Sequence, residues 1–407
     1  MKSSVSSQGK ATGLKSDEID VVLSDSWHAE LKQLNDRHLL RIMPEVSGLP
    51  GRVTLVQGKP ALNFCSNNYL GLAAHPSLIQ AAGEYAQRYG AGATASRLIA
   101  GNGEPHRELE AFIATWKGTE AALLFGSGYQ ANVGILSSLM EQGDLIISDE
   151  LNHASIIDGC RLSRAEVAIY PHASLHHLEG LVRRSGFRRK LVVTESVFSM
   201  GGDMAPLRDI WYLCRRWGSL LMVDEAHATG VWGPQGQGLA AEWGVVPDIQ
   251  MGTLGKAVGA AGAYVAGSKH LIQLLVNRAR SFIYTTAPPP PVVGSALAGL
   301  RIIASEEGGR RRAQLQKNMR EFARLIAENL GIACETSHIV PVVVGQSART
   351  MEVSRLCLEQ GVFVQGIRFP TVPEGTARLR FSLMSEHLST DLDCAADVVA
   401  HAIRATA

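Results

Sequence analysis

Short apolar runs that alternate with helical segments between about residues 121 and 266 constrain the fold of this chain most strongly. The run at 220–223 has the composition of a buried parallel strand. Further runs of this kind occur at 121–125, 144–149, 167–170, 191–194 and 249–251. Strands that alternate with helices predict an α/β fold with a mostly parallel, doubly wound sheet. Ligands bind to such sheets at the carboxyl ends of the strands, so we expect the functional residues there.

Polar groups follow two of these runs. The run at 220–223 ends in Asp224-Glu225-Ala226-His227, and the run at 249–251 leads to Lys256. A single lysine is ordinarily a solvated surface charge. Lys256, however, stands among glycines and small apolar residues, and desolvation in such surroundings lowers the pKa of an ammonium group. A lysine of this kind is a candidate Schiff-base nucleophile.

Asp224, His227 and Lys256 together suggest pyridoxal 5'-phosphate (PLP) as a cofactor. PLP needs an amine to hold its aldehyde and a carboxylate to keep its ring nitrogen protonated, because the charged ring stores the electrons of a carbanion at the α-carbon of the substrate. Lys256 and Asp224 supply these two groups, and His227 can hydrogen-bond the phenolic oxygen of the ring. The set is specific for this cofactor, although each residue alone is not.

Two further segments fit the same cofactor. The turn Gly126-Ser127-Gly128-Tyr129 stands between the strand at 121–125 and a helix, and the N–H groups of such a turn bind phosphate together with the helix dipole. No G-K-[ST] follows, so the turn is not a P-loop. His153 follows the strand at 144–149 and is a candidate to lie over an aromatic ring. A capping or surface role is the ordinary alternative for a single histidine.

The length of 407 residues predicts two domains. We expect a disordered tail at 1–20, an N-terminal segment at 21–65, a large domain at 66–300 and a small α+β domain at 301–407. The expected helices outside the large sheet lie at 26–41, within 292–330, at 349–360 and at 389–405, and the expected strands of the small domain lie at 339–345, 362–367 and 377–384. Arg378 and Arg380 share one face of the last strand, which is either a solvated edge or a grip for a substrate carboxylate.

Composition and charge narrow the classes of function. Lysine and arginine number 39 and aspartate and glutamate 38, which gives no support to a nucleic-acid surface. No apolar stretch reaches the roughly 18 residues of a membrane span, and the N-terminus lacks the apolar core of a signal peptide. The six cysteines are scattered without a C-x-x-C pair, so we expect reduced thiols in the cytoplasm and no zinc site.

With these residues in place, the chain resembles the α-oxoamine synthases, PLP enzymes of fold type I, from about residue 31 to its C-terminus. The resemblance is carried by NFCSNNYLGL, GATASRLIAG, LLFGSGYQANVG, LNHASIIDG, VVTESVFSMGGDMAPL, LMVDEAHATGVWG, GTLGKAVG, FIYTTAPPP and GIRFPTVPEGTARLRFSL. It implies that an amino acid is joined to an acyl thioester with loss of CO2. GIRFPTVPEGTARLR favours the members that condense L-alanine with a pimeloyl thioester, on coenzyme A or an acyl carrier protein, in biotin biosynthesis. The alternatives are glycine or serine with another acyl chain, an aminotransferase reaction and a non-catalytic scaffold.

The resemblance also implies roles for single residues. Lys256 would hold PLP and move the α-proton, Asp224 would pair with the ring nitrogen, His227 would bind the ring oxygen, and His153 would stack on the ring. The other residues implied at the cofactor are Ser127, Gly128, Tyr129, Ser199 and Thr253, with Thr285 and Thr286 reaching in from the second subunit of a homodimer. The residues implied at the substrates are Asn67 and Arg380 for the amino acid carboxylate, and Arg41, Arg368 and Thr371 toward the acyl group. Ala95 departs from the family, in which glycine is expected, and stiffens a loop near the acyl channel.

Overall fold

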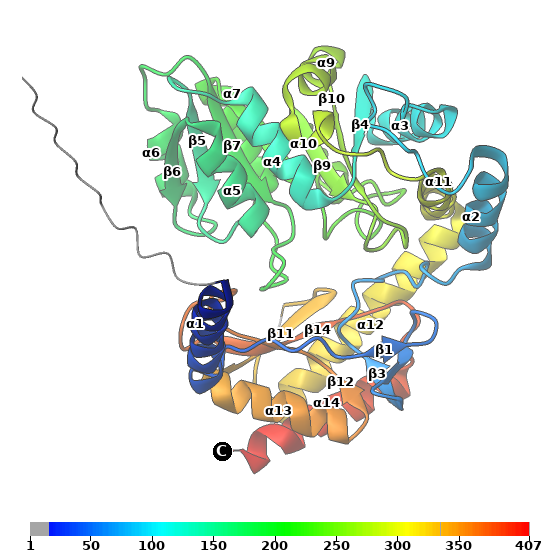
Figure 1. Ribbon diagram of the computed structural model, residues 1–407, viewed down its shortest axis with the longest axis vertical. Coiled ribbons are helices and arrows are strands. Elements are labelled where there is room, and N and C mark those ends of the chain that lie inside the picture. The colour runs from blue at the N-terminus through cyan, green and yellow to red at the C-terminus, as the bar shows by residue number, and fades with distance from the viewer. Residues whose placement is uncertain (1–15, 334, 407) are drawn as a thin grey trace, which may run out of the picture.

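A seven-stranded sheet lies at the centre of the larger of two lobes in the computed structural model, which describes residues 16–333 and 335–406 (Figure 1). Its strands are β4 (Ala121–Phe125), β5 (Leu145–Asp149), β6 (Glu166–Tyr170), β7 (Lys190–Glu195), β8 (Leu220–Asp224), β9 (Ile249–Thr253) and β10 (Ala263–Gly267). They are arranged in the order β4-β10-β9-β8-β7-β5-β6. β10 runs antiparallel to both neighbours, and the other pairs are parallel. The prediction of a mostly parallel sheet is therefore confirmed.

Helices cover both faces of this sheet, which explains why its central strands are continuous apolar runs. On β8, Met222 packs with side chains of α4 (Gly128–Leu139) and α9 (Lys269–Arg278), whereas Leu221 and Val223 pack with side chains of α7 (Leu207–Trp217). The other helices of this lobe are α2 (Pro76–Tyr89), α3 (Glu104–Lys117), α5 (Ala154–Ser163), α6 (Leu175–Val182), α8 (Leu239–Glu242), α10 (Arg280–Ile283) and α11 (Pro290–Ala304).

The register of the parallel strands brings their polar carboxyl ends together. Glu195, the last residue of β7, lies opposite Asp224, the last residue of β8. Asp224 in turn lies opposite Met251 of β9. Beyond β9 the chain forms a loop that contains Lys256 and then returns as β10. One edge of the sheet therefore collects two carboxyl groups and a lysine.

The smaller lobe contains two further sheets, and one of them combines three strands from the N-terminal part of the chain with one strand from the C-terminal part. The first consists of β1 (Val46–Ser47), β2 (Val53–Val56), β3 (Lys59–Asn63) and β12 (Val362–Phe363). The second consists of β11 (Ile339–Gly345), β14 (Ala377–Ser382) and β13 (Gly366–Ile367). α13 (Ser347–Glu359) and α14 (Ser389–Ala405) complete this lobe, and α12 (Glu306–Leu330) runs between the lobes (Figure 1).

Two predicted elements of the C-terminal part are interrupted. The single strand predicted at 362–367 is wrong, because β12 pairs in parallel with β3 while β13 pairs antiparallel with β14. The chain changes sheets between them, at the point where the carbonyl group of Gln365 accepts the N–H of Arg380 at 3.3 Å. The helical pattern at 292–330 is divided at Ser305, which is extended (φ −88°, ψ 177°) between α11 and α12.

The N-terminal helix is displaced from its predicted position at 26–41. α1 (Ser16–Asp36) is followed by His38 in the left-handed region (φ 55°), where the N–H of Leu39 bonds to the carbonyl group of Leu34 at 2.7 Å. Of the tail predicted at 1–20, residues 16–20 are helical and residues 1–15 lie outside the described part of the chain. Within the described residues, no helix combines the length and apolarity needed to cross a membrane.

Candidate active site

Lys256 lies at the carboxyl edge of the large sheet, on the loop between β9 and β10. Its Nζ is 2.9 Å from Nε2 of His227. Burial lowers the pKa of Lys256 to about 8, and the neighbouring carboxyl groups of Asp224 and Glu195 oppose this shift. Part of the side chain stays accessible, so an incoming molecule can reach it. An amine with this pKa is partly unprotonated near neutral pH and can act as a nucleophile or a base.

Hydrogen bonds connect Lys256 to Arg380 through His227, Tyr69 and Asn67. His227 Nδ1 is 2.6 Å from the hydroxyl of Tyr69, which donates to Oδ1 of Asn67 at 3.0 Å. The same oxygen accepts Nη1 of Arg380 at 3.2 Å. Because an amide oxygen only accepts, Tyr69 gives its proton to Asn67 and accepts one from His227. His227 Nε2 is then an acceptor facing Lys256. Burial lowers the pKa of His227 well below its usual value, so the ring is neutral.

A second series of hydrogen bonds connects Asp224 to His153. Asn132 of α4 donates to Oδ2 of Asp224 at 2.8 Å and to Oγ of Ser155 at 2.9 Å. The hydroxyl of Ser155 is 2.8 Å from Nδ1 of His153. Asp224 is only 4% exposed, and the N–H of Ala226 donates to its other oxygen at 2.8 Å. The carboxylate is thus held in one orientation, whereas His153 is exposed at the start of α5.

The N-terminus of α4 forms a polar cradle near these residues. Ser127 caps the helix, and its Oγ accepts the N–H of Gln130 at 3.2 Å. At position 128 a Cβ atom would lie 3.0 Å from Cε of Met251, which is closer than an ordinary contact. Glycine therefore allows the start of α4 to lie against Met251. The free N–H groups and the dipole of a helix N-terminus stabilise a bound phosphate.

The other residues predicted at the cofactor differ in their surroundings. Ser199 and Thr253 are buried, and the carbonyl group of Ser199 accepts Nε of Arg380 at 2.6 Å. Tyr129 is half-exposed, and its hydroxyl donates to Asp158 of the neighbouring helix α5 at 2.5 Å. Thr285 and Thr286 follow α10, where Thr286 lies on the surface of this chain. The structure therefore brings together Ser199, Thr253 and the residues of the two hydrogen-bond series, but leaves Tyr129, Thr285 and Thr286 at the periphery.

The groups described above fit PLP. An amine of lowered pKa, a buried and oriented carboxylate, an exposed imidazole ring and a helix N-terminus match the four parts of the cofactor that must be held. The pocket also contains buried polar atoms without a partner among the described residues, namely Oε1 of Glu195 and Oδ1 of Asn132. Such atoms indicate a place for a polar ligand.

A cavity of about 620 Å³ brings together Arg41, Arg368, Thr371 and Arg380, the residues predicted at the substrates apart from Asn67. Arg368 is buried; its Nη2 donates to the carbonyl group of Leu40 at 2.6 Å, and its Nε has no partner among the described residues. Nη2 of Arg41 is 3.5 Å from the hydroxyl of Thr371. Burial, and then the charge of Arg41, lower the pKa of Arg368. None of the described residues that line this cavity is acidic.

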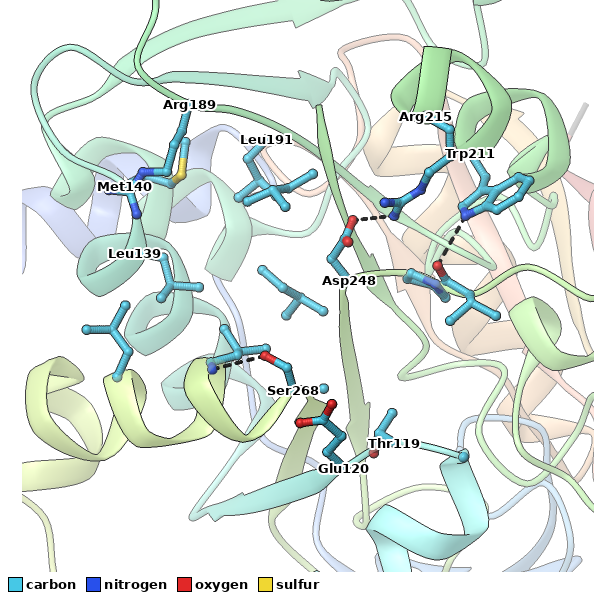
Figure 2. A pocket seen from close by; sticks show the side chains of 18 residues that line it. Thr119, Glu120, Leu139, Met140, Arg189, Leu191, Trp211, Arg215, Asp248 and Ser268 are labelled. Carbon is cyan, nitrogen blue, oxygen red and sulfur yellow. Dashed lines mark hydrogen bonds and ion pairs between the residues drawn. The ribbon is translucent and has the colours of Figure 1, made fainter. Parts of the chain in front are cut away.

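A separate cavity of about 660 Å³ opens at the opposite edge of the large sheet (Figure 2). It is lined by Leu191 at the start of β7, Leu220 at the start of β8 and Ile249 at the start of β9. Two of the charged side chains that line it pair with each other: Arg215 donates to Asp248 at 2.6 Å, a contact visible in Figure 2. Because Lys256 lies at the other ends of these strands, this cavity is not part of the site.

Sequence reasoning missed Tyr69, Asn132 and Glu195. Each lies within a segment that carried the family resemblance, but only the folded chain shows which side chains point inward. A signal for Glu195 was present, because it ends a buried strand as Asp224 does. The reasoning that identified Asp224 from the end of its apolar run could have identified Glu195 in the same way.

A family model for class I and II aminotransferases matches residues 59–399. An 8-amino-7-oxononanoate synthase from Anaeromyxobacter dehalogenans is 50% identical over 90% of this chain and 92% of its own length. One from Geobacter sulfurreducens is 48% identical over 93% of this chain and 98% of its own length.

Solved structures agree with these relatives. A serine palmitoyltransferase from S. paucimobilis with a bound PLP–myriocin aldimine has a TM-score of 0.88 at 29% identity, covering 95% of this chain and 98% of its own. An 8-amino-7-oxononanoate synthase from Francisella tularensis has a TM-score of 0.73 at 28% identity, covering 85% and 98%. The fold is that of PLP-dependent enzymes of fold type I, and PLP is the cofactor. The chain belongs to the class I and II aminotransferase family and, within it, to the family of the 8-amino-7-oxononanoate synthases.

Proposed function

We propose that the protein condenses L-alanine with a pimeloyl thioester to give 8-amino-7-oxononanoate, CO2 and a free thiol, as an acyltransferase of biotin biosynthesis. The relatives at about half identity over nine tenths of the chain support this reaction. The observation on this chain that carries it is the cavity with Arg41 and Arg368, two guanidinium groups without an acidic partner in its lining.

The charge of this cavity favours an acyl group with a carboxylate at its far end. A buried guanidinium without a counter-ion is costly, and a carboxylate is the partner that it binds best, through two parallel hydrogen bonds. A pimeloyl group ends in a carboxylate, whereas a simple fatty acyl group would place a methyl group against Arg368. The cavity therefore favours the pimeloyl reaction over that of a palmitoyl-transferring relative.

In this proposal the amino acid binds at Arg380, which lines the same cavity. Arg380 is held by the carbonyl group of Ser199 and by Oδ1 of Asn67, so its guanidinium is fixed before the substrate arrives. It grips the carboxylate of the amino acid, and this places the α-carbon near Lys256. The departing CO2 comes from the carboxylate that Arg380 has held.

Lys256 and Asp224 carry the proton and charge chemistry. When PLP is bound, its protonated ring supplies the sink for the electrons released at the α-carbon. Asp224 would keep the ring nitrogen protonated, His227 would bind the ring oxygen, and His153 would stack on the ring. Lys256 would hold the aldehyde group of the cofactor through Nζ and would act as the base that removes the α-proton and returns one. Ser127, Gly128, Tyr129 and Thr253 would hold the phosphate.

We further propose a cytoplasmic homodimer in which Thr285 and Thr286 of the second subunit complete the site across the interface. Leu98, Ile99 and Tyr284 are 50%, 81% and 72% exposed, which is unusual for large apolar side chains in one region. The segments that carry them are joined by the hydrogen bond from the N–H of Ala287 to the carbonyl group of Ala95 at 3.0 Å. A second copy of the chain covers this surface in a two-fold symmetric dimer.

Thiol release tests the proposed reaction. Pimeloyl-CoA is offered with alanine, glycine or serine, and each product is identified by its mass; pimeloyl-acyl carrier protein is offered in parallel. Release with alanine and a product of the mass of 8-amino-7-oxononanoate supports the proposal. Release with glycine or serine alone would assign a different member of the family, and no release with any pair would contradict the proposal.

A further inference from the structure

Glu195 is a second carboxyl group in the cofactor pocket, and the functions proposed above do not use it. It is the last residue of β7 and lies opposite Asp224, the last residue of β8, in the parallel register. Glu195 is 3% exposed and Asp224 is 4% exposed. Two carboxyl groups therefore lie side by side at the buried edge of the sheet.

The hydrogen bonds of these two groups differ. Both oxygens of Asp224 accept a hydrogen bond, from Asn132 and from the N–H of Ala226, each at 2.8 Å. One oxygen of Glu195, Oε2, accepts the N–H of Ser199 at 3.2 Å. Its other oxygen, Oε1, is buried without a partner among the described residues. Both oxygens of Asp224 are thus held by donors, whereas only one oxygen of Glu195 is.

The charged groups around Glu195 leave it without a counter-ion of its own. Lys256, from the loop after β9, is hydrogen-bonded to His227. Arg380 of β14 donates to the carbonyl group of Ser199 and to Asn67. Asp224 repels a second negative charge, and partial desolvation lowers the pKa of His153 ahead of α5. Adjacent buried carboxyl groups cannot both ionise easily, so one of them retains a proton.

That proton belongs to Glu195. Burial raises the pKa of Glu195 to about 8 and Asp224 acts in the same direction, while Lys256 and the backbone N–H groups of His153 and Ser199 oppose them. Oε2 is occupied as an acceptor by the N–H of Ser199, so the proton is carried by Oε1. A neutral carboxylic acid donates a hydrogen bond, and Oε1 has no acceptor within the described protein.

We propose that Glu195 is a positioning residue of the PLP site, which acts as a neutral hydrogen-bond donor from Oε1 to the bound cofactor and leaves Asp224 as the single carboxylate charge beside the ring. This role rests on the assignment of the pocket to PLP but not on the identity of the acyl donor. Above its pKa, Glu195 adds a negative charge, which favours the protonated form of the lysine-bound cofactor.

Three replacements in the PLP-loaded enzyme test the role. Glu195→Gln keeps the shape and one N–H donor but cannot ionise; Glu195→Leu keeps the volume and loses the donor; Glu84→Gln alters a carboxylate on the surface of α2 as a control. The dissociation constant of PLP and the pH titration of the absorbance of the bound cofactor are measured for each. Infrared difference spectra between pH 6 and pH 10 follow the protonated carboxyl band.

We expect Glu195→Gln to bind PLP within about threefold of the unmodified enzyme and Glu195→Leu to bind it about tenfold more weakly, the effect of one lost hydrogen bond of roughly 1.4 kcal/mol. Both replacements should remove the component of the pH titration near pH 8 and the protonated carboxyl band, and Glu84→Gln should retain both. Loss of PLP binding in Glu195→Gln would show that Glu195 acts as an anion. Unchanged affinity and titration in Glu195→Leu would reduce Glu195 to a packing residue. None of these measurements uses an acyl substrate. A failure of the proposed condensation reaction can therefore be distinguished from a failure of the role proposed for Glu195.

Discussion

Nε2 of His227 lies 2.9 Å from Nζ of Lys256, and the other nitrogen of the same ring is 2.6 Å from the hydroxyl of Tyr69. Because Tyr69 gives its proton to Asn67, the protonation of the His227 ring is set by Tyr69, which is fully buried. The tautomer facing Lys256 is thus determined by a hydrogen-bond series that also ends at Arg380. Hydrogen bonds thus connect Lys256 to Arg380 within the protein itself.

Replacement of Tyr69 by Phe should lower the stability of the protein. The change leaves Nδ1–H of His227 buried without an acceptor, at a cost of about 1–3 kcal/mol in the free energy of unfolding. Urea unfolding of the PLP-free enzyme measures this, with Tyr212→Phe on the exposed surface of α7 as the matched control. Equal stability of the two variants would mean that the Tyr69 hydroxyl does not fix His227.

Replacement of Lys256 by Ala should abolish the covalent attachment of PLP and reduce product formation by more than about a thousandfold, since both the amine and the base are removed. Absorbance of the loaded enzyme and mass spectrometry of the product measure the two effects. Lys269→Ala, at the exposed start of α9, is the control and should behave as the unmodified enzyme does. Turnover near the normal rate in Lys256→Ala would exclude this lysine from the mechanism.

Replacement of Arg368 by Met should change the choice of acyl donor. If Arg368 binds the far carboxylate of the pimeloyl group, its loss costs about 1.5–3 kcal/mol, or roughly 10- to 150-fold in kcat/KM, mainly through KM. With octanoyl-CoA, which has no such carboxylate, the change should be less than about threefold. Arg404→Met on the exposed end of α14 is the control. Equal losses with both thioesters would place the carboxylate elsewhere.

His172 should make the stability of the protein depend on pH in the alkaline range. Its two ring nitrogens lie 2.9 Å from Asp149 and 2.7 Å from Asp203, and these hydrogen bonds raise the pKa of His172 to about 10. A pKa raised in the folded state contributes stability fully below the unfolded value of about 6.5 and loses it as pH rises toward 10.

Melting temperatures from pH 6 to pH 10 check this dependence. The difference between the unmodified protein and His172→Asn should be largest at pH 6 and should shrink toward pH 10. A constant difference across this range would show that the imidazole is not charged in the folded protein.

The large sheet could be predicted from the sequence because helices cover both of its faces, so that β7, β8 and β9 appear as continuous apolar runs. The positions of Asp224 and Lys256 followed from the ends of such runs. The split of 362–367 could not be predicted, since a short apolar run contains no information about which sheet each half joins. Tyr69 escaped prediction for a related reason: its role depends on His227, which lies far away in the chain and becomes a neighbour only in the folded protein.

The fate of the alanine carboxyl group tests the central claim most directly. Alanine labelled with 13C in its carboxyl group is incubated with pimeloyl-CoA and the PLP-loaded enzyme, and both the released gas and the product are analysed by mass spectrometry. Decarboxylative condensation predicts that the label appears in CO2 and that the unlabelled product has the mass of 8-amino-7-oxononanoate. Conversion of alanine to labelled pyruvate without thiol release would instead indicate an aminotransferase and contradict the proposed reaction.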